Sequence, residues 1–475
     1  MLSSTTVITT LLHILRVKVV ALLLGPSGVA IIAQLNQFLL TAANLASFGS
    51  APGVIRFAAK YASSNQKETL QTFIFTLFAS IAIGTGVFLA FGIPLKSYLS
   101  YLLLKDTAYS YLILFAILGV PATAFFINIR SMINGFLEIS TYARLTILSV
   151  ALNLLIIGPM IYFFHLFGAG LHIFIMSFFS LGIAVYELRR IQKARKISVK
   201  HGKYDRTMLM ELLKYGATSL ISTVAIDSAL MGVRVLIIHQ LSETEAGIFQ
   251  AAFVISAQVI TVIISSMGSY AYPRISELNS TEEAIRESNH AIRLALFTVT
   301  PLVIFVYSLR DEFIILFYSQ EFLLAANIIA WQLIGNFIRA ISSSIGVLLL
   351  PFRHLKAFWL VETGQSMIFF FAAYVLLPRF GLEACTIAYA LAYTFHFVAL
   401  YTYLKWKMAF RIERKNLKLL LLSGVLIFSF LIILKVDFLK SWYWIIPTLV
   451  LWAAISIEKE ERHAIITLIQ QRLKH

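Results

Sequence analysis

Residues 16–60 read RVKVVALLLGPSGVAIIAQLNQFLLTAANLASFGSAPGVIRFAAK, and this stretch decides how the chain folds. Apolar runs at 3–24 and 29–57 flank the turn sequence Gly25-Pro26-Ser27-Gly28. Glycine tolerates backbone angles that other residues avoid, and proline interrupts a helix, so these four residues predict a tight turn. Each run is long enough to cross a bilayer as a helix, which takes roughly 17 to 25 residues. The stretch therefore predicts a hairpin of two membrane helices.

The composition places the whole chain in the same class. Of its 475 residues, 59% are hydrophobic and only 13% are charged, and the mean hydropathy is +0.84. Ordinary soluble domains carry about 25% charged residues. The apolar runs are long and do not alternate, unlike the roughly ten-residue strands of an outer-membrane barrel. The sequence therefore predicts an all-α polytopic membrane protein.

About fourteen apolar segments are long enough to be transmembrane helices. They lie at 3–24, 29–57, 69–93, 108–134, 142–166, 169–188, 215–239, 246–272, 292–318, 323–350, 357–377, 383–404, 418–435 and 441–457. The N-terminus lacks a basic region and a small-residue cleavage site, so we interpret its helix as retained and not as a signal peptide. The single cysteine, Cys385, excludes an intrachain disulfide and a cysteine metal cluster.

Lysine and arginine concentrate in the connections that follow even-numbered segments. Eight lie between segments 6 and 7, and five lie between segments 12 and 13. The positive-inside rule places these connections, and both termini, in the cytoplasm. We therefore predict a multi-pass membrane protein. Because this topology explains the net charge of +16, we expect no nucleic-acid partner.

The basic connection at 191–214 separates six segments from eight, and the opening pattern returns after it. Gly28 and Gly49 are twenty-one residues apart, and so are Gly247 and Gly268. The alternative is a chance match, but both pairs lie in the first hairpin after a cytoplasmic start. We predict two six-helix lobes in parallel repeat around a central cavity, a recurrent transporter layout. The lobes cover 1–190 and 215–410, and 411–475 adds two peripheral helices and a cytoplasmic tail.

Charged residues inside the predicted spans mark the candidate site. A charge in lipid costs several kcal/mol, so it usually faces an aqueous path or a partner. Arg16 and Lys18 are two residues apart, about 200° around a helix, so only one can face a cavity fully. We favour Lys18 for the cavity, the alternative being that one of the two snorkels or pairs with a neighbour. Asp227 and Arg234 are seven residues apart and share a face that we expect to line the lumen.

Polar residues in three other segments extend the predicted site. Gln332, Asn336 and Arg339 follow an i, i+4, i+7 spacing, which puts them on one face of a helix. Glu362 in the next segment is a candidate counter-ion for Arg339. In the first lobe, Arg130 adds another intramembrane cation. The alternative for each residue is hydrogen bonding within the helix bundle.

The intramembrane charges sum to a cationic cavity. The cations are Arg16, Lys18, Arg130, Arg234 and Arg339, and the anions are Asp227 and Glu362. A low-dielectric cavity of net positive charge concentrates anions, and arginine matches phosphate through paired hydrogen bonds. An anionic, phosphate-bearing substrate is therefore expected. The sequence has no phosphate-binding loop, HExxH motif, Gly-x-Ser-x-Gly elbow or acidic cluster with metal spacing, so we expect neither an enzyme nor a metal or cofactor.

Three motifs resemble those of Wzx-type polysaccharide flippases. The opening Lys18-Val-Val-Ala-Leu-Leu-Leu-Gly25-Pro26-Ser27-Gly28-Val-Ala30 is similar to the first hairpin of that family. The sequence Ser131-Met-Ile-Asn134-Gly135-Phe, followed by Tyr142, resembles its connection between segments 4 and 5. Its hairpin of segments 7 and 8 is matched by Asp227 to Arg234, Ala246-Gly247-Ile-Phe-Gln250-Ala251 and Tyr272-Pro273-Arg274-Ile-Ser276.

The resemblance implies the fold of the multidrug/oligosaccharidyl-lipid/polysaccharide exporter superfamily, with Lys18, Asp227 and Arg234 inside its motifs. It implies a flippase that moves undecaprenyl-diphosphate-linked oligosaccharide from the cytoplasmic to the periplasmic leaflet by alternating access. The process served would be synthesis of lipopolysaccharide O-antigen or a related surface polysaccharide. The implied partners are the lipid-linked oligosaccharide, membrane lipid, and polysaccharide polymerase and chain-length proteins.

Two other functions stay open. An ion-coupled multidrug exporter of the same fold is expected to have an acidic cavity, which the charge count disfavours. A membrane-embedded polysaccharide polymerase or ligase usually needs a large external loop, and the connections between the predicted spans are short.

Overall fold

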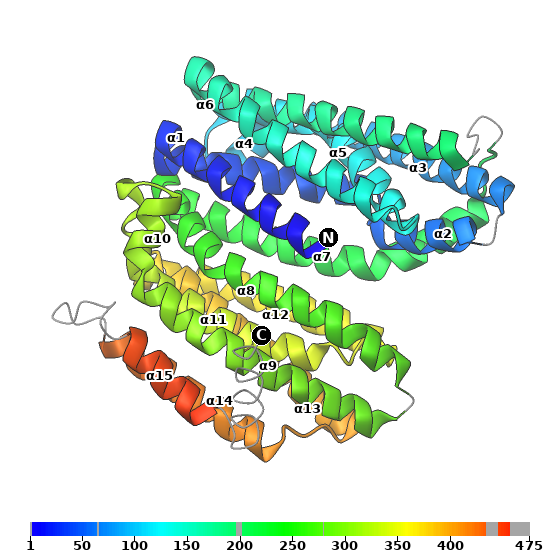
Figure 1. The fold of residues 1–475 in the computed structure, drawn as a ribbon. Coiled ribbons are helices and arrows are strands. Elements are labelled where there is room, and N and C mark those ends of the chain that lie inside the picture. The colour runs from blue at the N-terminus through cyan, green and yellow to red at the C-terminus, as the bar shows by residue number, and fades with distance from the viewer. Residues whose placement is uncertain (1, 64–65, 196–201, 279, 434–444, 457–475) are drawn as a thin grey trace, which may run out of the picture. The chain divides into compact units, whose positions relative to one another are not determined.

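The computed structural model describes residues 2–63, 66–195, 202–278, 280–433 and 445–456. The secondary-structure elements in these ranges are helices, and ten of them are long and apolar enough to cross a membrane (Figure 1). The predicted all-α polytopic fold is confirmed. The number of about fourteen spans stays a prediction, because the ten include helices that join two predicted segments.

Two compact units divide the chain. The first comprises Met1–Ala251, Ile314–Ala325 and Glu362–Cys385, and the second comprises Ala252–Phe313, Ala326–Val361 and Thr386–His475, each in so far as its residues are described. The division into lobes at 1–190 and 215–410 stays a prediction.

In the first unit, the other helices pack around α5 (Ser110–Gly135). The surrounding elements are α1 (Leu2–Ala46), α2 (Ala51–Ser63), α3 (Lys67–Gly92), α4 (Lys96–Leu104), η1 (Thr107–Tyr109) and α6 (Ile139–Arg195). The unit also contains α7 (Arg206–Gln240), η2 (Gln320–Phe322) and most of α12 (Leu355–Phe380). Ala116, Ile117 and Val120 on α5 are fully buried, so α5 forms the core against which the cavity-lining helices are held.

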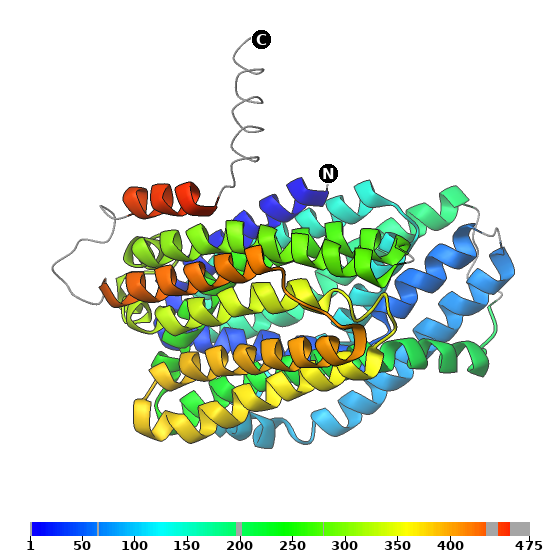
Figure 2. The ribbon, with the colours of Figure 1, turned by 90° about the horizontal axis from the view of Figure 1, so that it is seen from below.

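The first helix folds back on itself where the sequence predicts the turn. Gly25 has φ +63°, a left-handed angle that glycine adopts without steric cost, and Pro26 follows it. Figures 1 and 2 show the two halves of α1 running in opposite directions from this kink. The predicted hairpin of two helices is therefore present within α1.

The sixth helix has the same construction and joins two further predicted segments. Its kink lies at His165, with φ 49°. In Figure 1 the chain runs out along one half of α6 and returns along the other. Gly168 sits so close to the first half that a Cβ atom there would lie 1.9 Å from the Met160 carbonyl oxygen. The tight return lets both halves of α6 pack on α5.

The predicted second segment, 29–57, is interrupted. The helix ends at Ala46 and α2 begins at Ala51. Phe48 and Gly49 between them have φ of 56° and 59°, angles that a continuous helix does not contain. The break changes the direction of the chain before α2. The apolar composition of the stretch gives no sign of this break.

In the second unit, α9 (Thr281–Ser308) is the element on which the C-terminal helices pack. The other elements are the remainder of α8 (Glu243–Glu277), the start of α10 (Arg310–Phe317), and most of α11 (Ala325–Gly346) and α13 (Glu383–Met408), with α14 (Arg414–Ile433) and α15 (Ile445–Ser456). From Ile314 onward, α10 belongs to the first unit. Both α14 and α15 contact α9. Asn416 Nδ2 donates to the Asn289 carbonyl oxygen at 2.8 Å, which fastens α14 to α9. Lys435, Asp437 and Lys440, at the connection between the predicted segments 418–435 and 441–457, lie outside the described residues.

Gly247, close to the start of α8, is tightly packed within the first unit. A Cβ atom on Gly247 would lie 1.9 Å from the carbonyl oxygen of Pro26, so the start of α8 rests directly on the turn of α1. The sequence repeat pairs Gly247 with Gly28 of that same turn. The start of α8 and the turn of α1, which the repeat relates, therefore pack closely against each other.

We expect Gly247→Ala to destabilise the protein, because the added methyl group forces the start of α8 away from the turn of α1. Overpacking of this kind costs about 1–3 kcal/mol. The measurement is thermal unfolding in detergent, with Gly86→Ala as the matched control, since a Cβ atom on Gly86 meets no described atom within 4 Å. Equal melting temperatures for the two variants would contradict this account of Gly247.

Candidate functional site

A cavity of about 590 Å³ lies inside the first unit, between α1, α5, α6 and α7. Its walls combine apolar side chains with polar groups from all four helices. The charged and ring-bearing polar residues that line it are His13, Arg16, Arg130, His172 and Asp227, and the amides are Asn36, Gln37, Asn44 and Asn153. A polar cavity in a membrane unit offers a path for a group that lipid excludes.

Arg16 enters the cavity from the first half of α1. Its Nη1 atom donates a hydrogen bond to Asn153 Oδ1 at 3.3 Å, and its buried Nε atom has no hydrogen-bond partner among the described residues. The Asn153 carbonyl oxygen lies 3.2 Å from His172 Nε2, so both α6 halves hold this corner. A guanidinium with an unused, buried donor is suited to an anionic ligand, because leaving the donor unsatisfied is costly.

Arg130 supplies the second guanidinium, from α5. It is half-buried, and its Cζ atom lies 5.6 Å from the centre of the Phe126 ring on the preceding turn. That geometry allows a cation–π interaction, which orients the flat guanidinium. Within the described part of the chain, neither Arg16 nor Arg130 forms an ion pair. Their charges are therefore available to a ligand.

Gln37 links the cavity to a deeply buried cation. Arg234 on α7 is only 2% exposed, and its Nη2 atom donates to Gln37 Oε1 at 3.4 Å. The side chain of Gln37 also hydrogen-bonds to the carboxylate of Asp227. An amide can do both, because its oxygen accepts while its nitrogen donates. The carboxylate and the guanidinium are thus joined through Gln37 at the wall of the cavity.

The structure brings three of the predicted residues to the same cavity and a fourth beside it. Arg16, Arg130 and Asp227 line the cavity, and Arg234 contacts its wall through Gln37. Lys18 does not line this cavity. Its Nζ atom donates to the Ile315 carbonyl oxygen at 2.6 Å, in the last turn of α10, where helix carbonyls lack intrahelical partners.

The remaining predicted residues lie on α11 and α12. On α11, in the second unit, Asn336 Oδ1 accepts a hydrogen bond from Tyr389 at 3.0 Å, and Arg339 Nη1 donates to Thr261 at 3.5 Å. Gln332 is fully buried, and neither polar atom of its side chain has a hydrogen-bond partner among the described residues. Glu362 is half-buried on α12, in the first unit. Its pairing with Arg339 stays a prediction.

Several lining residues escaped the sequence-based prediction. His13 and His172 were not among the predicted site residues, yet both line the cavity. His13 precedes Arg16 by three residues, and residues three apart lie on one helix face, so the spacing contained a usable signal. Asn153 carried no such signal, because only the tertiary fold brings it to Arg16.

Residues 1–279 match the model of a family described as polysaccharide biosynthesis protein. This match spans more than half of the chain and includes every residue that lines the cavity. The chain belongs to this family. A curated relative from Escherichia coli (strain K12), named lipid III flippase, is 25% identical over 390 residues, covering 80% of this chain and 91% of the relative.

Solved structures share the fold of this family member. The lipid II flippase MurJ in an inward closed conformation has a TM-score of 0.70 at 14% identity, covering 99% of this chain and 98% of MurJ. An inward-facing multidrug resistance MATE transporter of the MOP superfamily has a TM-score of 0.69 at 16% identity, covering 84% of this chain and 94% of the transporter. The superfamily fold expected from the motifs is thereby confirmed.

We expect Asp227 and Arg234 to be energetically coupled. Asp227→Asn alone removes the negative charge that compensates the buried guanidinium, so it should lower stability. In Asp227→Asn/Arg234→Gln both charges are gone, and the double variant should lose less than the sum of the single variants. A coupling of about 0.5–3 kcal/mol is expected for residues in one network. Unfolding in mixed detergent micelles measures this coupling energy. Strictly additive effects would show that Asp227 and Arg234 are not coupled through Gln37.

Proposed function

We propose that the protein is a flippase for an oligosaccharide linked to undecaprenyl diphosphate. It moves this lipid from the cytoplasmic to the periplasmic leaflet by alternating access, in the synthesis of O-antigen or a related surface polysaccharide. The observation that carries the proposal is the cavity that presents Arg16 and Arg130 without an ion pair in the described chain. Family membership and the similarity to a relative named lipid III flippase support it.

The chemistry of the cavity fits a diphosphate. A diphosphate and its sugars must cross a region about 30 Å thick that hydrates neither. Guanidinium groups form short, charge-assisted hydrogen bonds to phosphate oxygens, and Asn and Gln side chains suit sugar hydroxyls. Arg16 and Arg130 come from different helices, α1 and α5, so the cavity offers guanidinium donors at more than one point of its wall. The hydrocarbon tail needs no such cavity and stays in lipid.

The alternative functions differ in what the cavity should attract. A multidrug exporter for cations is supported by the fold shared with MATE transporters, but two unpaired arginines repel a cationic drug. A polymerase or ligase would be an enzyme, whereas the relatives are named as flippases and transporters. We propose that this chain likewise transports and does not catalyse. Product analysis of the assay below reports glycan polymerisation or transfer directly.

The rest of the predicted assignment is proposed with the function. Lys18, Gln332, Asn336, Arg339 and Glu362 are proposed members of the substrate path. We place the protein in the inner membrane with both termini cytoplasmic. Polysaccharide polymerase and chain-length proteins are the proposed protein partners, because they act on the lipid-linked product after its transfer.

We expect Arg16→Gln and Arg130→Gln each to slow translocation by tenfold or more, because a hydrogen bond to a charged group contributes about 1.5–3 kcal/mol. The measurement uses proteoliposomes with a fluorescent, polyprenyl-diphosphate-linked glycan and a quencher that reaches only the outer leaflet. Arg16→Lys and Arg130→Lys retain the charge and should keep part of the rate. The matched control is Lys214→Gln, which removes an exposed charge from α7. Wild-type rates in a stable Arg16→Gln/Arg130→Gln variant would refute the proposal.

We also expect Lys18→Ala and Arg339→Ala to abolish surface polysaccharide without loss of the protein from the membrane. Both residues were assigned to the path from the sequence, and they lie on helices of different units. Immunoblotting of membranes and staining of surface glycan in cells measure the two quantities. Lys18→Arg retains a donor for the Ile315 carbonyl oxygen and serves as the control. Normal surface glycan in stably expressed variants would remove the residue concerned from the proposed path.

A further inference from the structure

A second concavity lies on the opposite side of α6 from the candidate site. It is a groove of about 540 Å³ between the two halves of that helix. Leu148 contributes from the first half, and Phe178, Phe179, Gly182, Ile183, Tyr186 and Glu187 contribute from the second. None of these residues lines the cavity between α1, α5, α6 and α7. The groove is therefore separate from the site proposed for the transported substrate.

The groove is open and almost entirely apolar along its length. Phe178 and Phe179 are 47% and 53% exposed. Gly182 forms part of its floor, and a Cβ atom built there meets no described atom within 4 Å. Apolar patches of this kind mark interaction sites. In a chain that spans a membrane, such a surface faces hydrocarbon.

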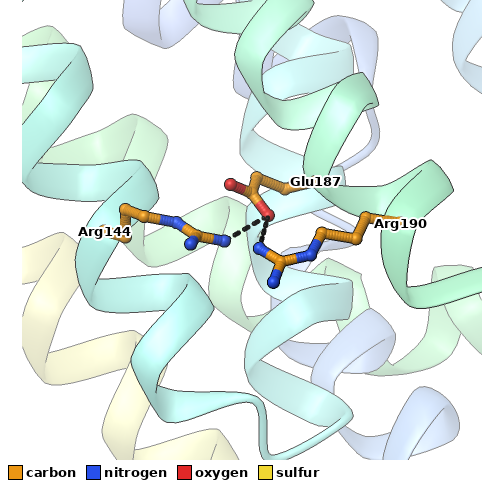
Figure 3. A network of polar contacts seen from close by, with 3 residues as sticks. All are labelled: Arg144, Glu187 and Arg190. Carbon is orange, nitrogen blue, oxygen red and sulfur yellow. Dashed lines mark hydrogen bonds and ion pairs between the residues drawn. The ribbon is translucent and has the colours of Figure 1, made fainter. Parts of the chain in front are cut away.

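One end of the groove carries a prearranged pair of guanidinium groups. The buried carboxylate of Glu187 accepts a hydrogen bond from Arg144 Nη2 at 2.7 Å and lies 3.8 Å from Arg190 Nη1 (Figure 3). The side chains of Arg144 and Arg190 are nevertheless 48% and 61% exposed. Each guanidinium has five N–H donors, so most donors stay available. The three charges sum to +1, and Arg189 and Lys193 on the same exposed turn make this end more positive.

The dimensions of the groove match one leaflet of a bilayer. Phe178 and Glu187 are nine residues apart on one helix, which corresponds to roughly 13 Å at 1.5 Å per residue. Half of the hydrocarbon core is about 15 Å thick. The cationic end is also the end that the positive-inside rule predicts to be cytoplasmic, where anionic lipids attract basic residues.

We propose that this groove binds one anionic phospholipid of the surrounding bilayer. The lipid phosphate accepts hydrogen bonds from Arg144 and Arg190, and one acyl chain lies along Phe178, Phe179 and Gly182. Glu187 orients the two guanidinium groups. A zwitterionic lipid fits less well, because its ammonium group meets the same cationic end. A docked protein helix would fill the apolar groove but would leave the exposed guanidinium donors without a phosphate.

Native mass spectrometry of the detergent-purified, full-length protein tests the proposal with phosphatidylglycerol as the probe and phosphatidylcholine as the zwitterionic comparison. A phosphatidylglycerol with a photoreactive acyl chain then maps the site. We expect preferential retention of phosphatidylglycerol, with crosslinks on α6 between residues 178 and 187. Arg144→Gln/Arg190→Gln should lower retention at least fivefold, and Arg144→Lys/Arg190→Lys should restore part of it.

A second variant tests the acyl chain independently of the charges. Gly182→Leu places a side chain in open space, so it should fold normally and remove the acyl-chain crosslinks. Gly86→Leu is the matched control, because Gly86 also lies on an exposed helix face with open space around it, and it should leave the crosslinks unchanged. The proposed function is tested separately, by the translocation rate of Arg16→Gln. This binding assay does not measure translocation, so the two proposals can fail independently.

Three results would overturn the proposal. The first is equal retention of phosphatidylcholine and phosphatidylglycerol. The second is unchanged retention in the Arg144→Gln/Arg190→Gln variant. The third is displacement of phosphatidylglycerol by undecaprenyl phosphate at a much lower concentration than by a second anionic phospholipid, which would assign the groove to the polyprenyl lipid.

Discussion

A guanidinium in the hydrocarbon region must meet an anion, a hydrogen-bond acceptor or water, and this constraint organises the first unit. Arg234 satisfies it through Gln37, which also contacts Asp227. Arg16 satisfies it only in part, through Asn153. Arg16 and Arg130 both line the cavity, and neither is neutralised by an ion pair within the described chain. Filling it with apolar side chains would bury both cations without a partner, at a cost of several kcal/mol each.

The kinks at Gly25 and His165 bring these cations together. Each kink turns one long helix into two halves that pack side by side, so α1 and α6 each contribute two walls to the cavity. Gly25 makes its turn without steric cost, whereas His165 holds a positive φ that is uncommon for a side-chain-bearing residue. In both hairpins the backbone on either side of the kink is helical, as a membrane requires.

Prediction from the sequence succeeded for features that depend only on residues within one helix or turn. Apolar length predicts the spans, and Gly25-Pro26 predicts the first turn, since both depend on local chemistry. The break at Phe48 and Gly49 was not predictable, because an apolar residue in a left-handed conformation leaves no pattern. The partners of the charged residues were equally hidden. Gln37 lies 197 residues from Arg234, and Ile315 lies 297 residues from Lys18. Such pairs are products of the tertiary fold and have no local signature.

The two faces of α6 line two separate concavities. Asn153, His172 and Met176 line the cavity of the candidate site, while Leu148, Phe178 and Phe179 line the apolar groove. Because a helix is rigid across its width, a lipid held against one face limits how far the other face can move. The ion pair between Arg144 and Glu187 joins the two halves at the cationic end. A phosphate bound to Arg144 draws on the same guanidinium that holds this ion pair.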